Sequence, residues 1–228
     1  MAKITRRNLL ALPILAPFAG MTLAGVLGQE AKLDQGAKLD QGAMKPMKPM
    51  LSPREKIKRR YFPDVTLTTH EGKKVRFYED LIKDKTVVIN MMYAECEGVC
   101  PGITANLVRV QKLFGDQMGR DIFFYSFTLK PEKDDQEALK HYAEMHKVGP
   151  GWLFLTGKPD DIELLRRKLG FTNPNPELDK DTSQHIGNLR FGNEPHMQWA
   201  ACPGLAKPSW IHESISWLMR RPEARAKL

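Results

Sequence analysis

The chain has 228 residues, a length that accommodates one domain of ordinary size together with additional segments. Hydrophobic residues make up 42% of it, which fits a packed globular core and argues against a disordered polymer. The formal net charge is +8, but no basic stripe interleaved with aromatic residues occurs, so the composition argues against nucleic-acid binding.

The first 28 residues have the pattern of an export signal. Arg6 and Arg7 precede an apolar run from Leu9 to Gly28, and the arginine pair resembles a twin-arginine signal, which passes folded proteins across a bacterial inner membrane. No Ala-x-Ala cleavage site ends the run, and no cysteine precedes Cys96, which rules out a lipoprotein signal. We expect a cleaved signal first, with an uncleaved anchor that tethers the chain to the membrane at 9–28 and a buried helix as the alternatives. The expected location is the periplasm or the periplasmic face of the inner membrane.

Residues 29–60 are predicted to be a low-complexity linker. The hexapeptide Ala-Lys-Leu-Asp-Gln-Gly occurs twice in tandem over 31–42, and a Met-Lys-Pro tract follows whose prolines forbid a helix. Methionine thioethers are soft metal ligands. Met44, Met47 and Met50 therefore belong either to a plain linker or to a route along which a soft metal moves.

The pattern over residues 61–228 predicts one α/β domain. It opens with a hairpin of Val65–Thr69 and Lys74–Phe77 around a turn with Gly72. Strands and helices then alternate, so we expect a sheet that is at least partly parallel. Strands are predicted at Thr86–Tyr93, Asp121–Leu129, Trp152–Leu155 and Ile186–Phe191, helices from Ile103 to Met118 and at Pro131–Val148, Asp160–Leu169 and Ser209–Met219, and a loop at Asn173–Asp181.

Two cysteines follow the first central strand in the run Cys-Glu-Gly-Val-Cys-Pro at 96–101. Ligands of parallel sheets bind beyond the carboxyl ends of the strands, which is where Cys96 is expected. If Pro101 starts a helix, the spacing allows the Cα distance of roughly 4.4–6.8 Å that a disulfide requires. The start of the helix also favours thiolates over thiols.

Glu95 and Glu97 flank Cys96 on both sides. Negative neighbours raise the pKa of a thiol but favour a bound cation, so a metal site suits this surrounding better than a nucleophilic thiol. The spacing also differs from the Cys-x-x-Cys of thioredoxin-type catalysts. The pair can hold a soft metal, exchange thiols with disulfides or form a static disulfide, and the first is favoured.

The cysteine run after an apolar strand is similar to the Cys-x-x-x-Cys-Pro motif of the Sco/SenC family. The segment Ser126–Asp134 also resembles a strand-to-helix segment of that family that contains Pro-Glu-x-Asp, and the resemblance extends from about Phe62 to Met219. It implies a thioredoxin-like fold and a copper chaperone that assists assembly of the binuclear copper centre of cytochrome c oxidase. The copper-receiving subunit of that oxidase would be the partner.

The resemblance further implies a distant histidine as the third copper ligand. His185 fits because an apolar strand and a turn follow it, whereas the rival His196 lacks such a strand. The predicted metal site is therefore Cys96, Cys100 and His185, a donor set that suits Cu(I) and, with a further ligand, Cu(II). Gln184 stands where the family usually has Asp, which puts the affinity and geometry of the site in question.

Two functions remain open for the same cysteines. The first is a metallochaperone, and the second is a thiol–disulfide oxidoreductase that keeps the copper-ligand cysteines of a partner reduced and is itself reset by a thiol reductant protein. Cys202 is predicted to be a buried or free thiol, with pairing to another molecule as the alternative. The other histidines offer no partners at ligand spacing or lie on an amphipathic helix: His70, His141, His146 and His212.

Overall fold

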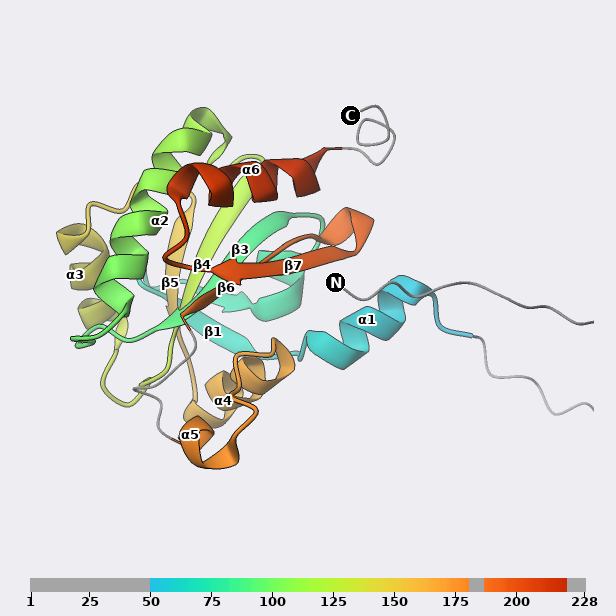
Figure 1. Ribbon diagram of the computed structural model, residues 1–228. Coiled ribbons are helices and arrows are strands. Elements are labelled where there is room, and N and C mark those ends of the chain that lie inside the picture. Colours follow the sequence, from blue (N-terminus) through green and yellow to red (C-terminus); the bar gives the residue numbers. More distant parts are fainter. Residues whose placement is uncertain (1–49, 181–186, 221–228) are drawn as a thin grey trace, which may run out of the picture. The chain divides into compact units, whose positions relative to one another are not determined.

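The computed structural model describes residues 50–180 and 187–220, which form a seven-stranded sheet with helices on both faces (Figure 1). The strands follow the order β2-β1-β5-β4-β3-β6-β7. Their bounds are β1 Thr66–Thr69, β2 Lys74–Arg76, β3 Thr86–Met92, β4 Ile122–Thr128, β5 Trp152–Thr156, β6 Asn188–Asn193 and β7 Gln198–Pro203. The α-helices are α1 Pro53–Tyr61, α2 Cys100–Phe114, α3 Gln136–Met145, α4 Pro159–Lys168, α5 Pro176–Lys180 and α6 Pro208–Met219, and three short helical turns are Phe77–Ile82, Gly115–Gln117 and Glu194–His196.

The sheet is parallel in its centre and antiparallel at both sides. Strands β3, β4 and β5 run parallel, the β1–β2 hairpin pairs antiparallel with β5, and β6 and β7 follow β3 as an antiparallel pair. These pairings confirm the predicted hairpin and the partly parallel sheet of an α/β domain. Parallel neighbours need crossover helices, which is why α2 and α3 follow β3 and β4.

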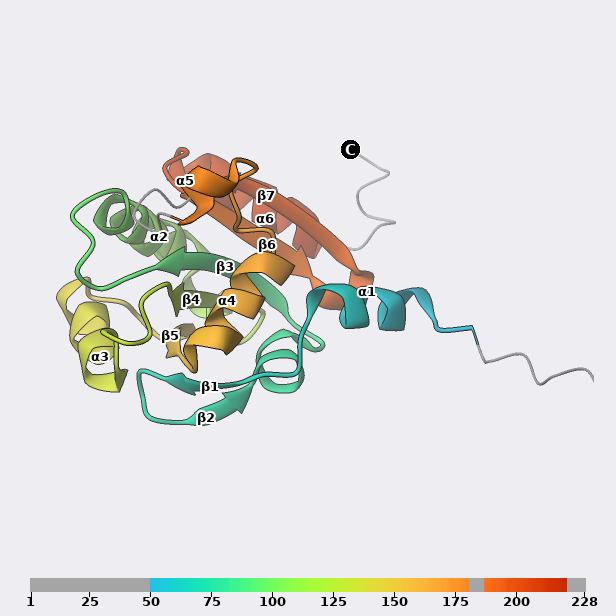
Figure 2. The same cartoon turned by 90° about the horizontal axis from the view of Figure 1, so that it is seen from below.

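Helices α2, α3 and α6 share one face of the sheet, and α4 crosses the other (Figure 2). The hydroxyl groups of Thr104 on α2 and Tyr142 on α3 lie 2.9 Å apart, which joins these two helices. The ring of His212 on α6 lies 4.5 Å from that of Phe114 on α2. The cysteine-bearing helix is therefore packed on both flanks.

Strand β3 is buried at all seven positions, as expected for a β-branched run covered by helices on both faces. Its one buried amide is satisfied inside the sheet: Ser126 Oγ donates to Asn90 Oδ1 over 2.7 Å, and Trp152 Nε1 donates to Ser126 Oγ over 2.8 Å. Because three adjacent strands share this chain of hydrogen bonds, a buried polar group costs little there and fixes the pairing of the strands.

Helix α1 lies within the range that the sequence pattern assigned to the linker, upstream of Tyr61. Ser52 caps it in a capping box with Glu55, and Pro53 occupies its first turn. None of its residues is buried, so no apolar periodicity marks it in the sequence. Ion pairs attach it to the domain: Arg54 donates to the fully buried Glu194 over 2.6 and 2.7 Å, and Lys58 donates to Glu79 over 2.7 Å.

Further elements differ from the predicted ones. Helix α2 ends at Phe114 rather than Met118, because Gly115 leaves the helical conformation with a φ of 53°. Helix α3 begins at Gln136 rather than near Pro131, because the Asp135 carboxylate caps it by accepting from Ala138 N over 2.9 Å. The short helix α5 stands where a loop was expected, and strand β7 was not predicted.

None of the helices in residues 50–180 and 187–220 is both long and apolar enough to span a bilayer. The predicted signal or anchor at 1–28 and the methionines at 44 and 47 lie outside the described residues.

Candidate functional site

The two motif cysteines lie just beyond the carboxyl end of β3, as predicted. Strand β3 ends at Met92, Cys96 lies in the connecting loop, and Cys100 is the first residue of α2. The loop is fixed at its start, where Cys96 N donates to Tyr93 O over 3.3 Å. Both cysteines thus lie at the predicted edge of the sheet, where the ligands of parallel sheets bind.

Both thiols are buried and close to each other. Cys96 is 6% exposed and Cys100 is 1% exposed, and neither is joined in a disulfide. The Cys100 thiol donates a hydrogen bond to the Cys96 sulfur. The loop therefore turns the two sulfur atoms toward one point without joining them, the arrangement that a two-thiolate metal site needs.

The surroundings of the two thiols shift their pKa values in opposite directions. Burial acts to raise the pKa of Cys96, but hydrogen bonds from the Cys100 thiol and N–H, the Tyr93 hydroxyl and the Gly98 N–H outweigh it and lower this pKa. Burial, together with the neighbouring Cys96, raises the pKa of Cys100. Cys96 is therefore the sulfur that ionises first.

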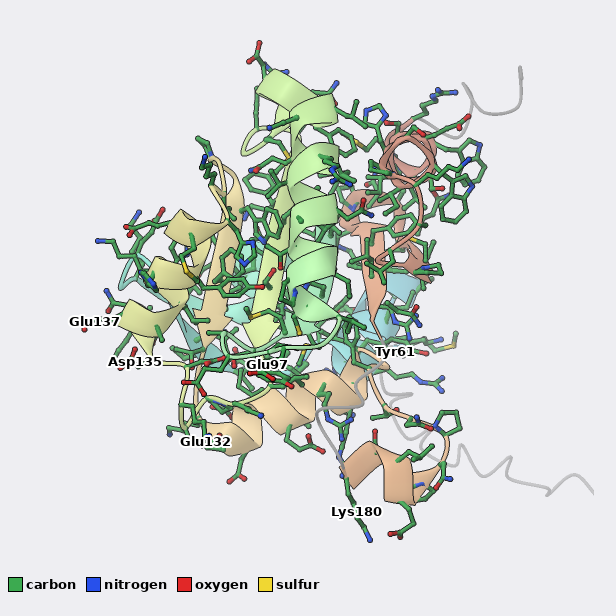
Figure 3. The ribbon with its side chains drawn as sticks, turned by 60° about the vertical axis from the view of Figure 1, so that its left-hand side comes forward. Tyr61, Glu97, Glu132, Asp135, Glu137 and Lys180 are labelled. Atoms are coloured by element: carbon green, nitrogen blue, oxygen red, sulfur yellow. The ribbon has the colours of Figure 1, made fainter. Side chains whose placement is uncertain are left out.

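This result corrects one expectation from the sequence. Glu95 and Glu97 were expected to raise the pKa of Cys96, yet that pKa is lowered. Both glutamates are exposed, so water screens their charges, whereas the hydrogen bonds act directly on the buried sulfur. Figure 3 shows Glu97 at the lower end of α2, at the surface of the domain.

The buried carboxylate of Asp134 holds the cysteine loop by a hydrogen bond. It is 2% exposed, and its Oδ2 accepts hydrogen bonds from Ala94 N over 3.0 Å and from Thr128 Oγ1 over 2.5 Å. One carboxylate oxygen thus ties the end of β4 to the loop after β3. The sequence pointed to this residue only through its place in the Pro-Glu-x-Asp segment.

Stability should depend on pH through Asp134. Burial raises the pKa of this carboxyl above the value of about 3.9 that it has in an unfolded chain. The native state then binds the proton more tightly than the unfolded state. The contribution of Asp134 to the free energy of unfolding therefore falls as pH rises from the unfolded pKa to the higher pKa of the native state. The side chain of Asp134→Asn cannot ionise, so the variant should not show this loss of stability. Its free energy of unfolding, relative to that of the wild type, should therefore rise between pH 4 and pH 7. Urea denaturation at both values measures the difference, and equal pH dependence of the two proteins would refute it.

Tyr93 contacts Cys96 directly, and Lys130 acts on it through Tyr93. Neither residue was identified as part of the site from the sequence. The Tyr93 hydroxyl donates to the Cys96 sulfur, and Lys130 Nζ lies 4.0 Å from the centroid of the Tyr93 ring. A cation over the ring face holds the tyrosine in place. The only sequence signal for Tyr93 is its position at the end of the apolar strand.

The segment that leads into β6 is held against the first turns of α2, the helix that begins at Cys100. Gly204 N donates to Gly187 O over 2.7 Å, and Asn106 Nδ2 on α2 donates to Gly204 O over 2.8 Å and to Ala206 O over 2.7 Å. A Cβ atom on Gly187 would lie 2.9 Å from Ile103 Cδ1, so the backbone at Gly187 runs against the first turns of α2. This close approach accounts for glycine at position 187.

The predicted third ligand, His185, lies outside the described residues. Within residues 50–180 and 187–220, no three His, Cys, Asp or Glu side chains gather in a way that would hold a metal ion. The rival His196 lies at the wrong end of the sheet: it follows Asn193, which pairs with Thr86 at the start of β3. Seven residues of strand, roughly 20 Å, separate that end from the cysteine loop.

The other histidines and the third cysteine have structural surroundings. His70 Nδ1 accepts from Phe154 N over 3.2 Å, and the ring of His146 lies 4.3 Å from that of Tyr142. Cys202 lies on β7, where it is buried and outside any disulfide within the chain; its pairing with another molecule stays a prediction. Burial raises its pKa to about 11.

Comparisons with known proteins agree with the fold and the motif. A model of the SCO1/SenC family matches residues 54–217. The SCO1 protein homolog of Bacillus subtilis (strain 168) is 29% identical over 93 residues, which are 40% of this chain and 47% of that protein. The matched part thus spans about half the length of this curated relative.

Two solved structures show the same architecture. Bradyrhizobium japonicum ScoI with copper bound aligns with a TM-score of 0.56 and 19% identity over 68% of this chain and 98% of that chain. BsSco aligns with a TM-score of 0.56 and 22% identity over 69% of this chain and 92% of that chain; a disulfide switch was identified in it, and it is described as a member of the Sco family of cytochrome c oxidase assembly proteins. These likenesses confirm the predicted thioredoxin-like fold.

Proposed function

Because this chain belongs to the SCO1/SenC family, we propose that it binds copper through Cys96, Cys100 and His185 and delivers it to a cytochrome c oxidase during assembly of that enzyme. The observation that carries the proposal is the pair of buried, reduced thiols that are hydrogen-bonded to each other at the carboxyl end of β3. Two soft sulfur donors and one imidazole form a three-coordinate set that favours Cu(I). Copper is the cargo of this site, and the copper-receiving subunit of the oxidase is the partner.

The position of Gly187 supports His185 as the third ligand. Gly187 lies two residues after His185, and a Cβ atom on it would lie 3.6 Å from a methyl group of Val99, the neighbour of Cys100. Two residues of chain span at most roughly 7 Å. This chain length allows an imidazole at position 185 to reach the two sulfur atoms, which supports the proposed ligand.

The site is arranged for transfer as well as for binding. Copper binding needs both thiols in the thiolate form, so loading releases protons, and the lowered pKa of Cys96 makes this sulfur the first to bind. Gly98 and Val99 are exposed between the two buried thiols. A partner can therefore approach the metal across the loop without opening the domain.

We place the copper site outside the cytoplasm. The arginine pair and the apolar run at 9–28 support export and, where the run is retained, a tether at the periplasmic face of the inner membrane. Substituting Arg6 and Arg7 by lysine in a tagged chain tests the twin-arginine route, and unchanged export would contradict it.

The histidine assignment predicts a selective loss of copper binding. We expect His185→Ala to lower the affinity for Cu(I) by roughly 10- to 100-fold while leaving two sulfur ligands in place. Anaerobic titration of the reduced full chain against a chromogenic Cu(I) chelator measures the change. His196→Ala is the matched control, because this histidine lies at the other end of β3, and it should bind copper as the wild type does. A His185→Ala chain that competes as well as the wild type would remove His185 from the site.

A second function is favoured by the opposite pKa shifts of the two thiols. A sulfur that ionises early beside one that keeps its proton suits thiol–disulfide exchange. The Cys96 thiolate would attack a disulfide of the partner, forming a mixed disulfide and releasing one partner cysteine as a thiolate. Cys100 would then attack the mixed disulfide at Cys96 and release the second partner cysteine, and a thiol reductant protein would reduce the resulting Cys96–Cys100 disulfide. The same variants separate the two functions, since His185→Ala should retain reductase activity while losing copper affinity.

A further inference from the structure

A groove lies on the α4 side of the sheet, on the side of the domain that carries α1. It encloses about 410 Å³. Ile57 and Tyr61 of α1 form one wall, and Ile89, Trp199 and Ala200 of the sheet form an apolar floor. The end of α4 and the neighbouring strand β6 contribute basic residues to the rim: Arg167, Lys168 and Arg190.

The rim carries positive charge that faces solvent. Lys168 is exposed at the end of α4, and Lys56 and Arg60 are exposed on α1, one residue before each of the two groove residues of that helix. The Arg190 guanidinium donates to the backbone oxygens of Leu169 over 3.2 Å and Gly170 over 2.6 Å. Backbone oxygens hold this group in place without neutralising its charge, so a negatively charged ligand finds a fixed cation there.

The floor holds a buried donor without an acceptor. Trp199 Nε1 is the one buried side-chain nitrogen or oxygen within residues 50–180 and 187–220 that has no hydrogen-bond partner. The Trp199 ring packs 5.0 Å from that of Phe62, so its apolar part is well placed while its N–H is not satisfied. Such a group costs free energy until an acceptor arrives, which is an independent sign of a ligand.

The cysteine site lies away from this groove. Figure 2 shows α1 and α3 at opposite sides of the domain, and Figure 3 shows Glu132 and Asp135 beside the first turn of α3, across the domain from Tyr61. Glu97, in the cysteine loop, is exposed like these two acids. A negatively charged surface therefore attracts the basic rim of the groove.

We propose that the α1–α4 face docks on an anionic phospholipid surface, with headgroup phosphates on the basic rim and the apolar part of a lipid on the groove floor. The chemistry of the groove matches such a lipid in three respects: cations on the rim for the phosphates, an apolar floor for the acyl chains, and an unsatisfied Trp199 N–H that can donate to an ester oxygen of the lipid. The face also begins with α1, the first described helix after the part of the chain that holds the apolar run at 9–28. Docking directs the cysteine loop away from the bilayer, toward a partner.

The test uses the full chain reconstituted in lipid nanodiscs, with phosphatidylcholine alone or with phosphatidylglycerol added. The zwitterionic discs control for tethering, because the apolar run is held in both kinds of disc. Hydrogen–deuterium exchange is followed at the backbone amides of 57–62 and 167–170. We expect these amides to exchange more slowly in the anionic discs, and to lose that protection in 1 M salt, which screens charge–charge attraction.

A pair of charge-matched variants decides the outcome. Lys56→Glu with Lys168→Glu reverses two charges on the rim. Because each basic side chain near an anionic lipid surface changes binding roughly fivefold, the equilibrium constant for docking should fall well over tenfold. Lys74→Glu with Lys112→Glu makes the same change in net charge on β2 and α2 and should leave the protection intact. Equal exchange in both kinds of disc, or equal loss in both variants, would overturn the proposal. Copper titration of the same proteins separates lipid docking from copper binding, because these variants should bind copper as the wild type does.

Discussion

Replacing Cys96 or Cys100 by serine is expected to abolish Cu(I) binding in competition with a chelator. Serine keeps the size of the side chain but exchanges a soft thiolate for a hard hydroxyl that does not ionise near neutral pH. A thiolate is a softer donor for Cu(I) than an imidazole, so losing either thiolate should weaken binding more than His185→Ala does, and we expect an affinity at least about 100-fold weaker. Anaerobic Cu(I) competition on reduced, full-length protein measures it.

The third cysteine supplies the matched control. Cys202 is as buried as Cys96, with exposed fractions of 4% and 6%, but it lies on β7 and pairs with Leu189 of β6. Cys202→Ser should therefore cost stability without changing the stoichiometry or affinity of copper binding. If Cys202→Ser weakened binding as strongly as Cys96→Ser, or if either motif variant still bound copper tightly, the assignment of the site would be wrong.

Removing the buried carboxylate of Glu194 should destabilise the domain by about 3 kcal/mol. This side chain is 0% exposed. It accepts from Arg54 at both oxygens, from the Tyr78 hydroxyl over 2.9 Å and from Asp84 N over 2.8 Å. Glu194→Ala leaves these three donors without their acceptor in a partly buried place, and breaking such a network costs more than the network contributes when it is intact.

Urea denaturation of the full chain measures this effect. Glu177 is the matched control, because it also pairs with a basic residue, Lys180, over 2.9 Å but is 78% exposed. Glu177→Ala should change the free energy of unfolding by less than about 0.5 kcal/mol. A loss below 1 kcal/mol for Glu194→Ala would show that Arg54 and Tyr78 find water in its place. In that case α1 would be held mainly by its other contacts.

The parts of the fold that sequence predicted are those in which pattern and burial coincide. Strand β3 is a mostly apolar, β-branched run, and the structure buries every residue of it. The position of Cys96 and Cys100 then follows from the topology, because the loop after a central parallel strand opens at the carboxyl edge of the sheet. The resemblance to one family added the copper chemistry and His185, which no local pattern supplied.

The parts that sequence missed depend on partners far away in the chain. Helix α1 has no buried face and is fixed by Glu194, 140 residues further on, so nothing within its own nine residues marks it as part of the domain. Strand β7 has no clear alternation of buried and exposed residues. The pKa of Cys96 was expected to move the wrong way, because adjacent glutamates are visible in a sequence and hydrogen bonds to a buried sulfur are not.

The attachment of α2 to the end of β7 determines when the cysteine site can form during synthesis. Asn106 bonds to Gly204, 98 residues later in the chain, and Gly204 in turn holds Gly187. Contacts between such distant residues form late in folding, because a long loop must close before they stabilise anything. A ribosome that has made the two cysteines must therefore add about a hundred more residues before their native surroundings exist. Until then the thiols stay open to oxidation and to the wrong metal, so the protection of the site depends on the last third of the chain.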